Sequence, residues 1–206
     1  MKVRVNTVPN ALSIAKEFAK LASSGQEPDP LTNLRLQKLL YYAQSWSLVV
    51  RDSELFPETV EAWRLGPVVP EVYRFFRDGF GVSEITDTHF PSTPDLPPAE
   101  AEFVLSIWES YKQHSPPHLS KLTHQELPWR KTWGDRTTQG TGNDPISVSD
   151  MEEWFSKQAI PAPIAEYEHN LRTAEDDARN QVAAMPQFDP VMLAAKAVSR
   201  SVSVPH

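Results

Sequence analysis

The sequence predicts a mainly α fold: a single compact helical domain followed by a C-terminal helical extension. Its 206 residues are 40% hydrophobic, enough for one ordinary domain with a core and one additional segment. Apolar residues recur at three- and four-residue spacing in most segments, and the 19 prolines separate these segments from one another. Residues that favour strands gather only near residues 58–65, so we expect at most one short β element there.

Composition narrows the classes of function. The chain has no cysteine, which excludes disulfides, thiolate metal sites and a cysteine nucleophile. Its net charge of −7 argues against a nonspecific polyanion binder and makes direct nucleic-acid binding an unfavourable interpretation. No window resembles the apolar region of a signal peptide or approaches the roughly 18 uncharged apolar residues of a membrane span. We therefore expect a cytoplasmic protein with no membrane partner.

The first two predicted helices form the start of the core. One runs from Asn10 to Ser23, with Gly25 following as a stop. The other lies in "LTNLRLQKLLYYAQSWSLVV", where Thr32 is a good N-cap and apolar residues cover most of the circumference. Such a helix is expected to be central and buried. Its few polar residues are expected to form its exposed side: Arg35, Gln37, Lys38 and Gln44.

The stretch "EAWRLGPVVPEVYRFF" contains a rigid corner. The pair Gly66-Pro67 sets a turn, because glycine tolerates positive φ and proline fixes its own φ. Pro70 suits the first position of a third helix. The corner carries Trp63 and Arg64, residue types that are enriched at binding hot spots. Two interpretations stay open here, a corner that only determines the fold and a corner that contacts a partner.

Further helices are expected from about Pro97 to Gln113, from about Ser115 to His124, and in "SDMEEWFSKQ". In the last of these, Ser149 and Glu152 have the spacing of a capping box. Past Pro161 the apolar stripe becomes thin and rich in alanine, which is typical of a helix that lies on something else. Its members recur at three and four residues and include Ile164, Tyr167, Leu171, Ala174, Ala178 and Val182.

The residues that carry chemistry form no recognisable catalytic or metal motif. His114, His118 and His124 do not have zincin spacing, and the prolines between the first two break any helix that would align them. "GDRTTQGTGND" lacks the GK[ST] of a phosphate loop. We expect no metal and no cofactor. A small hydrolase that uses His124 with an acidic partner such as Glu61 remains the alternative.

Three blocks in order resemble the Panacea domain, the SocA-like antitoxin domain related to phage-associated GepA proteins. They are "LTNLRLQKLLYYAQSW", "LFPETVEAWRLGPVVPEVYRFF" and "LTHQELPW", and the resemblance extends over about residues 11–159. It implies a mainly helical domain that neutralises a toxin by binding it directly, and it gives no catalytic residues. One relative in the family implies a second use of the fold, as a proteolytic adaptor that delivers the toxin to a protease.

The sequence is therefore interpreted as residues 1–160, a Panacea antitoxin domain, and residues 161–206, a helical extension with a flexible end. The expected partner is a cognate toxin, and the extension's stripe suits toxin docking or a homo-oligomer. A transcriptional autoregulator is disfavoured by the acidic balance. The candidate partner-binding residues are Arg35, Lys38, Trp63, Arg64, Tyr167, Leu171, Ala174, Ala178 and Val182.

Overall fold

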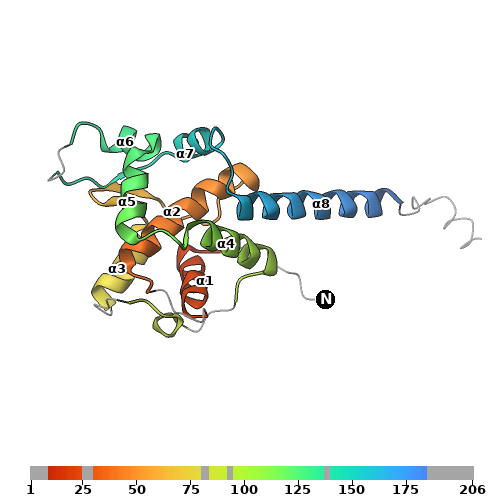
Figure 1. Ribbon diagram of the computed structural model, residues 1–206, viewed down its shortest axis with the longest axis horizontal. Helices are drawn as coiled ribbons and strands as arrows, with labels where there is room; N and C mark the ends of the chain where they lie inside the picture. The colour runs from red at the N-terminus through yellow and green to blue at the C-terminus, as the bar shows by residue number, and fades with distance from the viewer. Residues whose placement is uncertain (1–8, 25–29, 80–83, 92–94, 137–139, 185–206) are drawn as a thin grey trace, which may run out of the picture. The chain divides into compact units, whose positions relative to one another are not determined.

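The computed structural model describes residues 9–24, 30–79, 84–91, 95–136 and 140–184, and its fold is mainly α, as predicted (Figure 1). None of the helices in these ranges is long and apolar enough to cross a membrane. The chain divides into two units, the first ending at Glu168 and the second beginning at His169. The described elements are α1 Ala11–Ser23, α2 Asn33–Val50, β1 Glu61–Trp63, β2 Gly66–Val68, α3 Pro70–Gly79, the short 3₁₀ helix η1 Asp87–His89, α4 Pro98–Tyr111, α5 Pro116–Gln125, α6 Leu127–Trp133, β3 Asp144–Pro145, α7 Val148–Phe155 and α8 Ala162–Ala184.

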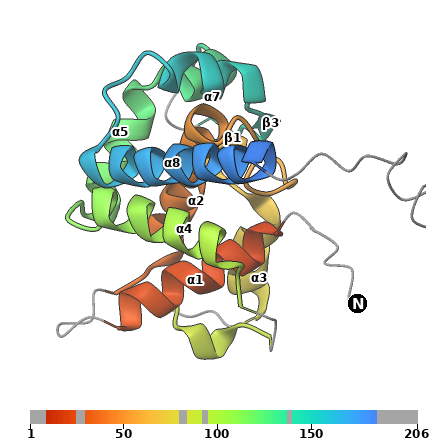
Figure 2. The ribbon, with the colours of Figure 1, turned by 90° about the vertical axis from the view of Figure 1, so that its right-hand side faces the viewer.

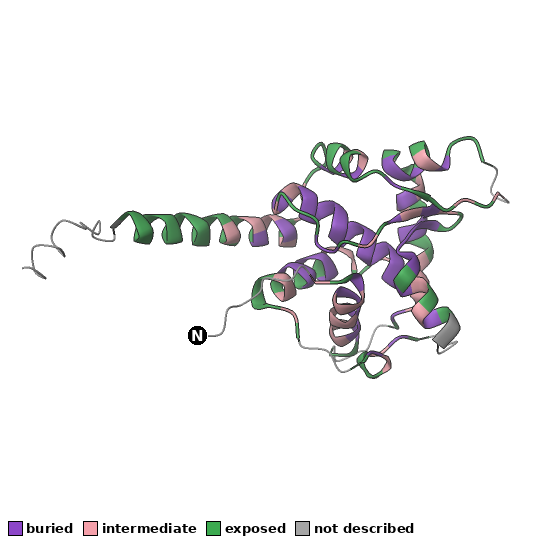
Figure 3. Ribbon diagram, turned by 180° about the vertical axis from the view of Figure 1, so that it is seen from behind, coloured by how far each residue is buried: buried purple, intermediate pink, exposed green. Residues whose placement is uncertain are grey.

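Helix α2 is the central element of the first unit, as the sequence predicted. The Thr32 side chain caps it by accepting from the Arg35 N–H at 3.2 Å. Helices α1, α3, α4, α5 and α7 and strand β2 all contact α2. Figure 3 shows α2 in the colour of buried residues along nearly its whole length. Because it is surrounded, α2 has no exposed polar side.

Helices α1 and α4 lie side by side (Figure 2), and each buries an aromatic residue. Asn10 caps α1 by accepting from the Ser13 N–H at 2.8 Å, while the predicted stop at Gly25 lies outside the described residues. Phe18 of α1 and Phe103 of α4 are both fully buried. The core therefore includes buried residues of α1 and α4 as well as those of α2.

A three-stranded antiparallel sheet of order β2-β1-β3 completes the first unit. Strand β1 falls inside the predicted β segment, and the fold class is confirmed. Strand β2 follows immediately, with Trp63 opposite Gly66. Strand β3 pairs with β1 from far along the chain, with Glu61 opposite Pro145. The sequence analysis did not anticipate β2 or β3.

The helices after α4 differ from expectation in two places. Helix α6 begins at Leu127, with Pro128 in its first turn, and was not predicted. Helix α7 begins at Val148 with Ser147 as its N-cap residue, so the capping box at Ser149 is wrong. The Ser149 hydroxyl lies 2.7 Å from the Ser147 hydroxyl, inside the first turn of the helix.

Candidate partner-binding site

The predicted corner is the loop of a β-hairpin. Strands β1 and β2 pair so that Trp63 lies opposite Gly66, which leaves Arg64 and Leu65 between them. We call Arg64 and Leu65 the hairpin tip. Gly66 has φ +103°, a backbone conformation that other residues rarely adopt. Arg64 is exposed and Leu65 is 50% exposed, so the tip presents a cation and an aliphatic side chain to solvent.

Helix α2 holds the second strand of the hairpin through buried polar side chains. The Lys38 ammonium donates to the Pro67 carbonyl at 2.7 Å. The Gln37 amide oxygen accepts from the Val69 N–H at 2.8 Å. Both bonds satisfy backbone groups that would otherwise be buried without a partner, which is costly in a protein interior. The pattern "RLQKLL" thus fixes the corner from beneath.

Helices α5 and α6 hold the tip itself. The Ser120 hydroxyl of α5 donates to the Leu65 carbonyl at 2.8 Å. The Trp129 indole N–H of α6 donates to the Trp63 carbonyl at 2.9 Å. The tip backbone is therefore tied on both sides while its two side chains remain exposed.

Lys38 is fully buried, so its predicted place on an exposed side of the helix is wrong. Burial lowers the pKa of Lys38 well below its usual range, because a charge is poorly solvated there. A Cβ added at Gly66 would lie 2.7 Å from the Lys38 nitrogen and 2.6 Å from the Thr123 hydroxyl. Lys38 therefore packs closely beneath Gly66, where its nitrogen satisfies the Pro67 carbonyl.

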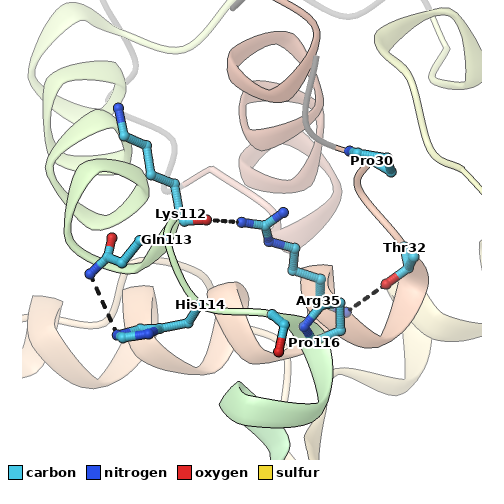
Figure 4. Close-up of a pocket in the computed structure, with 8 residues that line it drawn as sticks. Pro30, Thr32, Arg35, Lys112, Gln113, His114 and Pro116 are labelled. Carbon is cyan, nitrogen blue, oxygen red and sulfur yellow. Dashed lines mark hydrogen bonds between the residues drawn. The ribbon is translucent and has the colours of Figure 1, made fainter. Parts of the chain in front are cut away.

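Arg35 is also buried, at 2% exposure, contrary to the expectation of an exposed side chain. It donates to the Lys112 carbonyl, and its guanidinium lies 5.2 Å from the Trp108 ring centroid. Figure 4 shows it reaching across a cavity of about 450 Å³ towards the turn between α4 and α5. His114 lines the same cavity. Its pKa is lowered mainly by burial and, to a smaller extent, by the charges of His118 and Arg35. Arg35 therefore ties α2 to the end of α4.

A groove of about 250 Å³ opens beside the hairpin tip. We call it the tip groove; it is lined by Leu34, Gln37, Trp63, Arg64, Leu65, Val68 and Tyr73. The Trp63 ring meets the Tyr73 ring edge-on at 4.9 Å between centroids, and its indole N–H donates to Glu61 at 2.7 Å. The tryptophan is thus fixed as one wall. Sequence reasoning missed Leu65 and Tyr73, although an apolar residue at the loop of a tight turn was a usable signal for Leu65.

The candidate residues of α8 fall into two groups. Tyr167 is buried, with its ring centroid 5.1 Å from that of Phe103, so it anchors the start of the helix. Leu171 is half-buried, and the later members of the stripe are exposed: Ala174, Ala178 and Val182. The structure therefore separates an anchoring residue from a stripe that is open to a partner.

Among the described residues, the geometry gives the alternative based on His124 no acidic partner for that side chain. The centroids of the His124 and Trp129 rings lie 4.2 Å apart. The pKa of His124 is lowered mainly by burial and, to a smaller extent, by the charge of Lys38. Glu61, its suggested partner, accepts from Trp63. His114 and His118 stack at 4.8 Å between ring centroids. Within the ranges that the structure describes, no three histidine, aspartate or glutamate side chains gather as metal ligands.

The helical scaffold fixes the hairpin through hydrogen bonds from three helices and leaves its tip exposed. Residues 36–130 match the family model of the Antitoxin SocA-like, Panacea domain, which confirms the resemblance that the motifs predicted. The match runs from α2 to α6 and includes the hairpin. The relation to phage-associated GepA proteins stays a prediction.

A curated relative agrees with the family match. Antitoxin SocA of Caulobacter vibrioides (strain NA1000 / CB15N) is 51% identical to this chain over 47 residues, which are 23% of this chain. The aligned part spans 25% of the length of that protein. No solved structure matches the chain. Both the family and this relative are named for an antitoxin.

Proposed function

We propose that this protein neutralises a toxin by binding it directly, and that the hairpin tip and the tip groove form a principal contact. The observation that carries the proposal is a rigid backbone beneath two exposed side chains. Arg64 is exposed and Leu65 is 50% exposed, whereas the backbone around them is bonded from three helices. The family match supports the antitoxin part of the proposal.

Rigidity matters because association has an entropic cost. Each side chain or loop that becomes ordered on binding reduces the affinity, so a contact that is ordered beforehand binds more tightly for the same area. The tip backbone is fixed by Ser120 and Trp129, and the Trp63 wall by Glu61. Little order remains to be imposed when a partner arrives.

The chemistry of the tip suits one kind of toxin surface. The tip groove is walled by Leu65, Val68 and the rings of Trp63 and Tyr73, and Arg64 stands at its rim. An apolar side chain of the toxin would fill the groove, and a carboxylate beside it would pair with the guanidinium. Inhibition would follow from occlusion of the toxin's working surface, with no covalent chemistry.

The extension beginning at residue 161 supplies a second contact in this proposal, and residues 1–160 supply the scaffold. Ile164 and Tyr167 are buried and fix the first turns of α8. The stripe continues with helical spacing at the half-buried Leu171 and at the exposed Ala174 and Ala178. A stripe this thin gives a small apolar area, so it adds to a larger contact or pairs two copies, and does not bind alone. The flexible end assigned to the extension lies outside the described residues.

The experiment is cytoplasmic co-expression with the product of each neighbouring gene, scored by growth and by co-purification. Leu65→Asp is expected to abolish rescue and complex formation, because it places a charge in the apolar groove. Leu105→Asp is the matched control, since Leu105 is an exposed leucine of α4, at 41% against 50% for Leu65. Equal rescue by both variants would remove the tip from the proposal, and equal loss would show a general defect.

A further inference from the structure

A further pocket lies in the first unit where α2, α4, α5 and α7 meet. We call it the aromatic pocket; it has a volume of about 260 Å³ and is lined by Trp46, Tyr111, Leu122, Gln125, Glu126, Trp154, Phe155, Gln158, Ala159 and Pro161. Pockets for drug-sized ligands hold roughly 300–1,000 Å³. This one therefore suits a single side chain, and it shares no lining residue with the tip groove.

Its walls are aromatic and fixed. The Trp46 indole N–H donates to the Tyr111 hydroxyl at 2.8 Å. Phe155 meets the Trp46 ring edge-on at 5.1 Å between centroids, and Tyr111 stacks on Tyr42 at 4.1 Å. Trp154 is half-buried and adds a further aromatic wall. Aromatic faces attract cations through their quadrupole, and the effect is larger where water is excluded.

Glu126 is the one charged residue of the lining, and its carboxylate is incompletely satisfied. One oxygen accepts from the Tyr42 hydroxyl at 3.0 Å. The other oxygen is buried and has no hydrogen-bond partner among the described residues. The Tyr41 hydroxyl is near enough to oppose the effect of burial but makes no hydrogen bond to the carboxylate. An orphaned buried acceptor of this kind costs free energy until a donor reaches it.

The electrostatics agree with that geometry. Burial raises the pKa of Glu126 to about 7, and the hydroxyls of Tyr41 and then Tyr42 oppose this rise. A pKa this high means that the surroundings stabilise the ionised form of the carboxyl group poorly. The chain as a whole carries a net charge of −7, which favours encounter with a basic partner.

We propose that the aromatic pocket receives an arginine side chain of the toxin, with its guanidinium paired to Glu126 and its flat face against the aromatic walls. This proposal rests on the proposed function. A planar guanidinium matches both a carboxylate and aromatic rings, whereas an ammonium is a compact, strongly hydrated charge. The amides of Gln125 and Gln158, both exposed, stand at the rim and accept from the remaining N–H groups.

The test needs no toxin. The full chain is titrated with Nα-acetyl-arginine methylamide and with its citrulline counterpart, a neutral isostere, while the indole N–H signals of the tryptophans are followed by NMR. Saturable shifts of the Trp46 and Trp154 signals, with at least tenfold weaker binding of the citrulline compound, are expected. Equal binding of both compounds overturns the proposal. Tighter binding of guanosine, which also offers a planar donor edge, overturns it in favour of a nucleobase site.

Two variants locate the cation. Glu126→Gln keeps the shape of the side chain and is expected to abolish the preference for arginine over citrulline. Glu153→Gln is its matched control on α7, where Glu153 is exposed and pairs with Lys157 at 2.7 Å, and it should titrate like the unmodified protein. Trp154→Ala removes one wall of the pocket and should weaken binding. It replaces Glu126→Gln as the test if that variant fails to fold. Retained preference in Glu126→Gln overturns the assignment.

Co-expression separates this proposal from the one it rests on. If a neighbouring toxin is neutralised through a complex and Glu126→Gln leaves that complex unweakened, the arginine assignment is wrong and the antitoxin function stands. If no neighbour is toxic, the antitoxin function fails, and the assignment of the occupant to a toxin fails with it. The titration in that case still decides whether the pocket binds a guanidinium.

Discussion

Replacement of Gly66 by alanine tests the packing beneath the hairpin. Gly66 has φ +103°, and an alanine there costs about 1–3 kcal/mol for the backbone alone. The added Cβ would also lie 2.6 Å from the Thr123 hydroxyl and 2.7 Å from the Lys38 nitrogen. Both atoms are held by their own hydrogen bonds, so overpacking adds about 1–3 kcal/mol. We expect a loss of about 2–6 kcal/mol in the free energy of unfolding.

Gly134→Ala is the matched control for this change. Gly134 also has positive φ, at +63°, but no atom lies within 4 Å of the Cβ position. It should lose only the backbone contribution of about 1–3 kcal/mol. Urea unfolding of both variants, followed by tryptophan fluorescence, gives the two free energies. Equal losses would show that Gly66 does not pack against Lys38 and Thr123, and the account of the corner would be wrong.

Three further predictions concern the buried polar groups. The pKa of Glu126 is about 7 in the folded state, above its ordinary value of 4.5. Between these two pH values the folded state therefore binds more protons than the unfolded state. The free energy of unfolding should fall by about 3 kcal/mol as the pH rises through this window. Glu126→Gln should flatten this fall in unfolding curves measured across the window. The pKa of Lys38 is lowered in the folded state, so below the ordinary value of 10.5 the unfolded state binds more protons than the folded state. Stability should therefore rise as the pH increases towards 10.5. Lys38→Met should remove this rise in the same assay. Trp129→Phe leaves the Trp63 carbonyl without its donor and should cost about 1–3 kcal/mol in urea unfolding, whereas an unchanged midpoint would mean that water replaces the indole.

The sequence predicted the elements that local pattern determines. The stripe and the cap at Thr32 placed α2, and Pro70 placed the start of α3. Helix α6 was missed because seven residues are too few to show a stripe. Strand β3 was missed because its pairing with Glu61 joins segments far apart in the chain, which no local window contains. Register of this kind is a property of the folded unit.

The candidate site was predicted in part for the same reason. Trp63 and Arg64 were singled out by residue type, and the structure puts both at one groove. Lys38 was predicted to be exposed because charged residues are mostly exposed. This rule fails where a buried backbone carbonyl needs a hydrogen-bond donor. The aromatic pocket was not anticipated. Glu126 stands in the matched block "LTHQELPW", but only the fold brings it to Tyr42.

Helix α2 organises both candidate contacts by means of residues that never reach a partner. Gln37 and Lys38 bind the backbone of the hairpin, and Tyr42, one turn further on, holds one oxygen of Glu126. A change in these residues therefore disturbs the fold and both contacts together. A change at Arg64 or Leu65 alters one contact and leaves the buried bonds intact. Under the proposed function, this separation would let the exposed side chains be exchanged to suit a different toxin surface while the scaffold beneath them stays the same.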